Sequence, residues 1–317
     1  MEVVIVDYMA LGIALGGGFG SLMLWDGLKP YVDEAKKDLK DLYEASTYRR
    51  DIFGRWYEPR SSIASGWRYD QEKTVDPEDH WAVSNFAWYM QRQIFEEEEA
   101  KRKLKWEGIL PPVNDDENIF SIGGPGSSVY SRPVGFDIAK DTETPKLPIY
   151  IIYNSKWYND EFRKNPPKER VTRLYNGKPL DSGIWKVHVE DKYKNEIHTS
   201  EIDLDPKTGD LKPGVYAGTN LLEYDYLIIT MMRDSKAEEK VHCIIAGMYG
   251  PGTMAFKFIM KNHNGILKEI NEKRRGNKYF QSLLKIYIPR DNHEGRGWPV
   301  GFSKGSDIQL LGCVPIE

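Results

Sequence analysis

The chain has 317 residues, of which 29% are charged and 40% are hydrophobic, and its formal net charge is −4. This composition is that of a folded protein, and it excludes a disordered chain or one that crosses a membrane many times. The net charge excludes a global electrostatic attraction to nucleic acid. There are only two cysteines, Cys243 and Cys313, which are too few for a disulfide framework in a chain of this length; both lie in apolar runs. No CxxC or HExxH motif occurs, so no metal site is predicted.

The first 26 residues are the most apolar part of the chain. The stretch from Tyr8 to Trp25 carries no charged residue. At about 1.5 Å per residue, a helix of this length nearly spans a bilayer core. We therefore expect residues 1–26 to form a transmembrane anchor that contacts the membrane through residues 3–25. The alternative is a buried strand followed by a glycine-rich turn and a core helix.

The residues that flank this segment predict its orientation. No Lys or Arg precedes the apolar run, and four lysines follow it, at Lys29, Lys36, Lys37 and Lys40. The positive-inside rule then predicts a single-pass membrane protein with its N-terminus outside and its main domain in the cytoplasm. Three glycines repeat at GxxxG spacing, namely Gly12, Gly16 and Gly20. Such spacing favours helix association in lipid, so we expect a homo-oligomer or a transmembrane partner there.

Residues 27–107 show mainly helical patterns. Apolar residues over Leu28–Leu42 recur at alternating steps of four and three, which predicts a short helical seam. A second helix is expected over about Pro77–Trp106, where acid-before-base pairs support an exposed face. The stretch 46–78 between them is predicted to be largely irregular. Together these features predict a helical stalk, followed by a linker at 108–117.

Residues 118–317 have the pattern of an α/β domain. Short apolar runs predict seven strands, at Ile119–Ile122, Ile149–Tyr153, Trp185–Val189, Tyr226–Met231, Val241–Ala246, Leu284–Ile288 and Ile308–Val314. Helices are expected over Gly252–Asn262 and Ile266–Arg275. Several strands are continuously apolar, which is typical of buried parallel sheets. The expected fold class is therefore α/β, a Rossmann-like and mainly parallel sheet with a β-hairpin insertion at about 154–224.

Two glycine-rich loops follow predicted strands. The first reads GGPGSSVYSR after Ile122, and the second reads GMYGPGT after Ala246. Glycine lets backbone N–H groups approach an anion, and a helix N-terminus adds partial positive charge. If the two strands are parallel neighbours, both loops face the crevice where open α/β sheets bind ligands. The expected ligand contacts are Gly123, Gly124, Gly126, Ser127, Ser128, Arg132, Gly250, Gly252 and Thr253. The alternative for each loop is a tight turn.

A strand that ends in Gly-Gly-Pro and a distant strand that ends in GxxGxGT resemble a known α/β module. This module occurs in archaeal S-layer-type surface proteins and in uncharacterised prokaryotic regulatory proteins. The resemblance covers Ile119–Ser128 and about Asp225–Met260. An asparagine usually follows Gly-Gly-Pro in the module, whereas Ser127 or Ser128 takes that place here. The resemblance implies the fold more than a function.

A second candidate site lies in the loop IPRDNHEGRGWPVG. It contains Asp291, His293, Glu294 and Arg296. A histidine beside two carboxylates can act as a general base, whereas the alternative is a solvated connecting loop. His188 and His198 are expected to be structural or exposed. The segment DLDPKTGD lacks the glycine position of an EF-hand and is expected to form a hairpin turn.

The sequence thus predicts a membrane-anchored protein whose α/β domain binds a small anionic or nucleotide-like ligand, as a sensor or scaffold. One alternative is a structural membrane or envelope protein that assembles through its N-terminal helices. Another is a hydrolase or transferase that uses the 291–296 loop. No recognisable catalytic set or nucleic-acid-binding stripe is present. Enzymatic activity and any cofactor are left open.

Overall fold

The computed structural model divides into two compact units, residues 1–47 and residues 48–317. It describes residues 33, 40, 43–57, 61–65, 105–106, 118–126, 128–140, 142–154, 185–218, 222–233, 239–289 and 307–317. The described residues of the first unit are helical. All the sites discussed below lie in the second unit.

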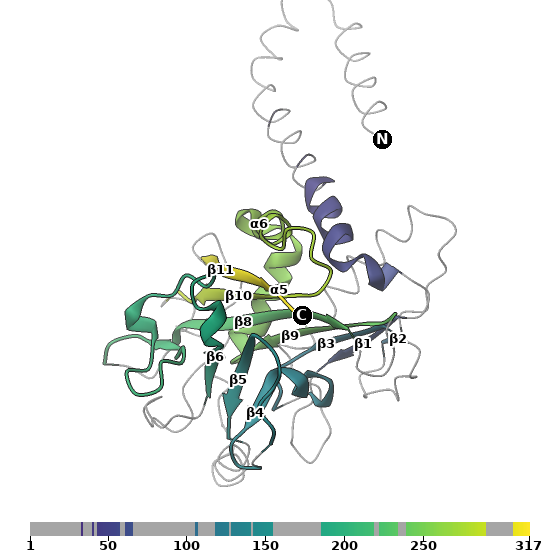
Figure 1. Cartoon of the computed structure of the whole chain (residues 1–317). Coiled ribbons are helices and arrows are strands. Elements are labelled where there is room, and N and C mark those ends of the chain that lie inside the picture. Colours follow the sequence, from purple (N-terminus) through teal and green to yellow (C-terminus); the bar gives the residue numbers. More distant parts are fainter. Residues whose placement is uncertain are drawn as a thin grey trace, which may run out of the picture. The chain divides into compact units, whose positions relative to one another are not determined.

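A mixed sheet forms the centre of the second unit (Figure 1), with eight strands among the described residues. The strand order is β11-β10-β8-β9-β3-β1-β2, and β7 also pairs with β8. The strands are β1 (Ser61–Ser65), β2 (Lys105–Trp106), β3 (Asn118–Ile122), β7 (Gly214–Val215), β8 (Leu222–Arg233), β9 (Val241–Gly247), β10 (Phe280–Tyr287) and β11 (Ile308–Pro315). Neighbours from β9 to β2 are parallel, whereas neighbours from β11 to β9 are antiparallel.

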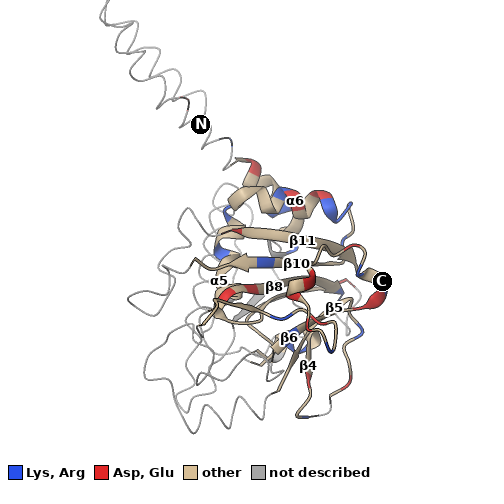
Figure 2. Cartoon of the chain, turned by 90° about the vertical axis from the view of Figure 1, so that its left-hand side faces the viewer, with Lys and Arg blue, Asp and Glu red and all other residues tan. Residues whose placement is uncertain are grey.

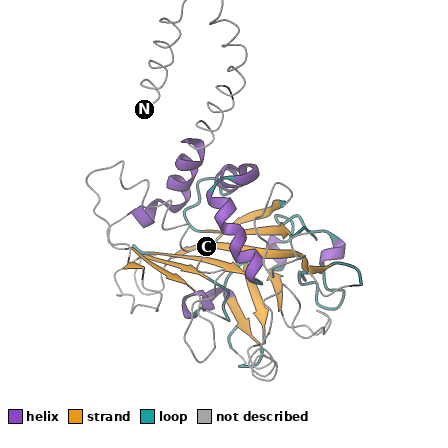
Figure 3. Cartoon of the chain, turned by 180° about the vertical axis from the view of Figure 1, so that it is seen from behind, coloured by secondary structure: helices purple, strands orange, loops and turns teal. Residues whose placement is uncertain are grey.

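A smaller sheet and several helices cover the larger sheet. The smaller sheet has the order β4-β5-β6, with β4 at Gly135–Asp137, β5 at Ile149–Tyr153 and β6 at Trp185–Val189. The α-helices are α5 (Gly250–Met260) and α6 (Ile266–Lys273), and residues 43–53 are also helical. Short 3₁₀ helices are η1 (Gly54–Tyr57), η2 (Val129–Val134), η5 (Asp191–Tyr193), η6 (Glu201–Asp203) and η7 (His263–Gly265). The α-helices α5 and α6 and the smaller sheet lie on opposite sides of the larger sheet (Figures 1 and 3).

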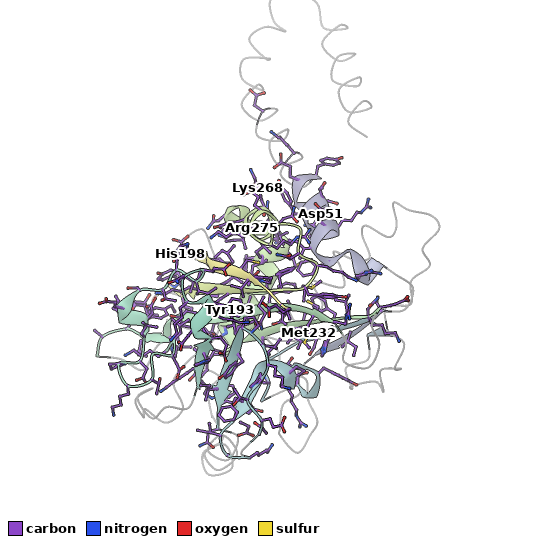
Figure 4. The ribbon with its side chains drawn as sticks, in the orientation of Figure 1. Asp51, Tyr193, His198, Met232, Lys268 and Arg275 are labelled. Atoms are coloured by element: carbon purple, nitrogen blue, oxygen red, sulfur yellow. The ribbon has the colours of Figure 1, made fainter. Side chains whose placement is uncertain are left out.

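One face of the larger sheet, the helix face, packs against α5 and α6. Alternate residues of β8 point to this face, because side chains alternate along a strand. Phe53, Phe120 and Phe256 meet there with ring centroids 5.8–6.1 Å apart. Such tilted and edge-to-face contacts are favourable aromatic geometries. Asn271 of α6 also donates to Asp51, at 3.4 Å, near the labelled Lys268 and Arg275 (Figure 4).

The opposite face, the small-sheet face, packs against β4, β5 and β6. Tyr226 and Ile228 of β8 point to it and share an apolar cluster with Ile149 and Val187. Gln281 of β10 joins the two sheets, because its amide accepts from Ile149 N at 2.7 Å and donates to Ile149 O at 2.8 Å. The start of β5, the central strand of the smaller sheet, is therefore fixed at one register on the larger sheet.

The predicted mainly parallel, Rossmann-like sheet is wrong. The three long strands β8, β10 and β11 form one side of the sheet, and every pairing among them, as well as the pairing of β8 with β9, is antiparallel. Their apolar runs reflect burial on both faces, which does not depend on strand direction. The expected β-hairpin insertion at about 154–224 also differs from the structure, because β6 pairs with β5 in a separate sheet that includes β4. The structure is mixed α/β and rich in sheet.

The predicted single-pass membrane protein is also corrected. Within the part of the chain that the structure describes, no helix has the length and apolarity needed to cross a membrane. Both α6 termini carry charged side chains (Figure 2). The predicted anchor 1–26, with its GxxxG glycines, lies outside the described residues.

Part of the predicted stalk contributes strands. Ser61–Ser65, expected to be irregular, forms β1 and pairs with β3. Lys105–Trp106, expected to end a helix, forms β2 beside β1. Strands this short and polar carry little periodicity, and their pairing partners are distant in sequence. Most of the predicted helix over Pro77–Trp106 and the linker 108–117 lie outside the described residues.

Candidate ligand site at the junction of two glycine loops

The two glycine loops meet at one edge of the larger sheet. β3 and β9 are parallel neighbours, with Ile122 opposite Ile245. Gly123 N donates to Ile245 O at 2.9 Å. A Cβ added to Gly124 would lie 3.2 Å from Gly247 O. The loops therefore lie side by side at the carboxyl ends of their strands.

The chain leaves these two strands toward opposite faces of the sheet. After β3 it enters η2, whose Val134 is buried in the cluster of the small-sheet face. After β9 it enters α5, whose Phe256 is buried in the cluster of the helix face. Adjacent parallel strands with connections to opposite faces define a topological switch point. We call this junction of the β3 and β9 loops the switch point.

Serine hydroxyl groups hold the first loop together. Gly123 has φ 126, a conformation that favours glycine. Ser121 Oγ lies 3.0 Å from Ser128 Oγ and 2.9 Å from Ser131 Oγ, and all three side chains are buried. Of the predicted contacts, Ser128 is thus engaged within the protein, Arg132 is exposed on η2, and Ser127 lies outside the described residues.

The second loop already holds a carboxyl group of the protein itself. Asp225 Oδ2 accepts from Gly252 N at 2.7 Å and from Tyr249 N at 3.1 Å, and Oδ1 accepts from Tyr226 N at 2.7 Å. Asp225 is fully buried. Burial raises its pKa to about 7, although the three N–H bonds favour the ionised form. The expected anion position at the start of α5 is therefore occupied by Asp225.

Close packing explains the glycines of the second loop. A Cβ on Gly252 would lie 2.6 Å from Tyr226 O, and one on Gly247 would collide with Thr253 N. Thr253 Oγ1 accepts from Gly247 N at 3.2 Å. The sequence showed these glycines and Thr253 but not their partner. The only available signal was Asp225, an acidic residue directly before an apolar strand.

Three aromatic side chains from separate elements gather beside the loops. Tyr153 ends β5, Trp185 begins β6, and Tyr249 precedes α5. The Tyr153 and Trp185 rings stack at 17° with centroids 5.2 Å apart, and Trp185 lies 6.2 Å from Tyr249. A Cβ on Gly126 would lie 3.0 Å from Trp185 Cη2. This aromatic layer was not predicted, because its members are distant in sequence.

A histidine–aspartate pair lies elsewhere, on β6. His188 Nδ1 is 2.7 Å from Asp210 Oδ1, and its Nε2 is 3.9 Å from Glu190 Oε1. The hydrogen bond to Asp210 raises the pKa of His188, while partial burial opposes this. The ring also packs 4.8 Å from Tyr150. This pair fastens the 203–212 segment to β6, so His188 is structural and partly exposed.

The second predicted site receives no description from the structure. Asp291, His293, Glu294 and Arg296 all lie outside the described residues. Among the residues that the structure does describe, no group of three or more His, Cys, Asp or Glu side chains is arranged to hold a metal ion. The general-base hypothesis for this loop stays a prediction.

Comparison with protein-family models, with curated proteins and with solved structures finds no match to this chain. The resemblance to the S-layer-type module therefore stays a prediction.

Proposed function

We propose that this chain binds a small anionic or nucleotide-like ligand at the switch point, as a sensor or scaffold domain. The observation that carries the proposal is the meeting of the β3 and β9 loops where their connections diverge. In open α/β sheets, ligands bind outside the carboxyl ends of strands at such a junction.

The two loops contribute differently to this proposal. Tyr249 N and Gly252 N both donate to Asp225, so these two N–H groups at the start of α5 are not available to a ligand. The first loop carries Gly123 in a left-handed conformation, and the exposed Arg132 follows it on η2. An anionic part of the ligand is therefore assigned to the first loop.

The test is the thermal midpoint of the full-length protein against a panel of nucleotides and dinucleotides. A ligand at a hundred times its Kd stabilises by about 2.7 kcal/mol, which raises the midpoint by several degrees. Gly124→Val should abolish the shift, because an added Cβ would already crowd Gly247 O. Gly54→Ala is the control, since a Cβ there meets nothing within 4 Å. No shift for the wild type at millimolar concentrations would refute the proposal.

A further inference from the structure

We infer that the switch point recognises its ligand mainly through a planar aromatic ring, such as a nucleobase, that stacks on the layer of Tyr153, Trp185 and Tyr249. A phosphate at the start of α5 is not the anchor. This inference rests on the proposed function and names the part of the ligand that supplies the affinity.

The start of α5 does not provide a phosphate-binding site. Phosphate sites at helix N-termini depend on backbone N–H groups that point at the ligand. Here Gly252 N and Tyr249 N point at Asp225 Oδ2, at 2.7 and 3.1 Å. Asp225 is enclosed on strand β8, and a Cβ on Gly252 would approach its Oδ2 to 2.7 Å. A phosphate there would have to displace this buried carboxyl group.

The aromatic layer provides the alternative anchor. Tyr153 is 6% exposed and forms the inner member of the stack, whereas Trp185 and Tyr249 keep partial exposure. The inner ring is fixed, because Tyr153 OH donates to Pro125 O at 3.4 Å. Stacking of a base on an aromatic side chain contributes about 1–3 kcal/mol, which corresponds to roughly 5- to 150-fold in affinity.

Gly126 brings the first loop against this layer. A Cβ on Gly126 would lie 3.0 Å from Trp185 Cη2 and 3.9 Å from Tyr153 Cδ2. The backbone of the first loop thus runs directly along the edges of the two stacked rings. A ligand that stacks on Trp185 would lie beside this loop, where its anionic part is assigned.

The test compares three probes on the full-length protein by calorimetric titration. The probes are the four ribonucleosides, their triphosphates and inorganic pyrophosphate. At least one nucleoside should bind within about tenfold of its triphosphate, and pyrophosphate should not bind. Trp185→Ala should weaken nucleoside binding by roughly 5- to 150-fold. Trp185→Phe keeps an aromatic face and should retain most of the affinity, which also separates stacking from a folding defect.

Two results would overturn the inference and leave the proposed function standing. The first is binding of triphosphates and pyrophosphate without any nucleoside. The second is unchanged nucleoside affinity in a folded Trp185→Ala protein. If none of the three probes binds the wild type, the inference and the nucleotide form of the proposed function fail together.

Discussion

The two faces of the larger sheet are covered in different ways. On the helix face, Phe53, Phe120 and Phe256 and the apolar side of α6 form a continuous hydrophobic cluster. On the small-sheet face, polar contacts also join the layers alongside an apolar cluster. These are Gln281 with Ile149 and Thr230, and Lys285 with Asp203.

This difference shows two ways of placing one layer on another. Apolar packing is non-directional and tolerates substitutions that conserve volume. A buried polar group costs free energy unless its hydrogen-bond partner is in place, so a polar contact between two layers allows only one register of one layer on the other. The small-sheet face carries β5, β6 and the aromatic layer, whose positions define the proposed site. The polar contacts between the two sheets thus lie on the face that carries the proposed site.

The largest effect is expected on the helix face. Phe256 is fully buried between Phe53 and Phe120. Phe256→Ala should lower the free energy of unfolding by about 3–5 kcal/mol, because it creates a cavity in the core. Phe258→Ala on the same helix is the control and should cost clearly less, since Phe258 is only partly buried. Urea denaturation measures both, and equal losses would contradict the assigned burial.

An intermediate effect is expected for the buried ion pair. Lys285 Nζ lies 2.8 Å from both carboxylate oxygens of Asp203 and 3.8 Å from the ring centroid of Tyr224. Lys285→Met leaves the Asp203 carboxylate without its cation and should cost roughly 3 kcal/mol of unfolding free energy.

The double variant Lys285→Met with Asp203→Leu sharpens the comparison. Replacing both partners by apolar groups should recover most of the lost stability, because no unpaired charge stays buried. If the double variant is as unstable as the single one, the pair supplies stability itself and does not serve mainly to fix the register.

The smallest effect is expected for His188, and it depends on pH. The folded-state pKa is raised above 6.5 by Asp210, with Glu190 acting in the same direction and Lys194 against it. The stability contributed is therefore complete below about pH 6.5 and is lost as the pH rises through the folded-state pKa. His188→Gln should remove this part of the pH dependence, roughly 1 kcal/mol or less because the ring is partly exposed.

Denaturation of His188→Gln and the wild type at pH 5.5 and 8.5 measures this difference. Asp225 also has a raised pKa, but it is present in both proteins and cancels in the comparison. His198→Gln is the control, because His198 is exposed on the segment after η5 (Figure 4). A His188→Gln protein with an unchanged pH profile would show that the pair does not stabilise through charge.

The sequence predicted the local elements of 118–317 well. Ile149–Tyr153 and Trp185–Val189 form strands with the predicted bounds, and Val241–Ala246 extends by one residue. The two predicted α-helices also form, each shifted or shortened by about two residues. Burial on one or both faces is written into hydrophobic periodicity, which is a local property.

The adjacency of the glycine loops was a conditional prediction, and its condition is met. Parallel pairing of β3 and β9 brings Gly124 next to Gly247. The sequence did not reveal what each loop does with its backbone donors. Ser121 and Ser131 support the first loop, and Asp225 occupies the second from the neighbouring antiparallel strand. Hydrogen-bond partners so far apart in sequence leave no periodic signal.

By itself, then, the sequence determined which segments of this domain are strands or helices and which loops are rich in glycine. Only the tertiary structure decided strand direction, the split into two sheets and the partners of the buried polar groups. The reason is physical: a buried strand has the same composition whether its neighbour is parallel or antiparallel. Pairing is decided by contacts between distant residues, such as Gln281 with Ile149 and Asp225 with Gly252.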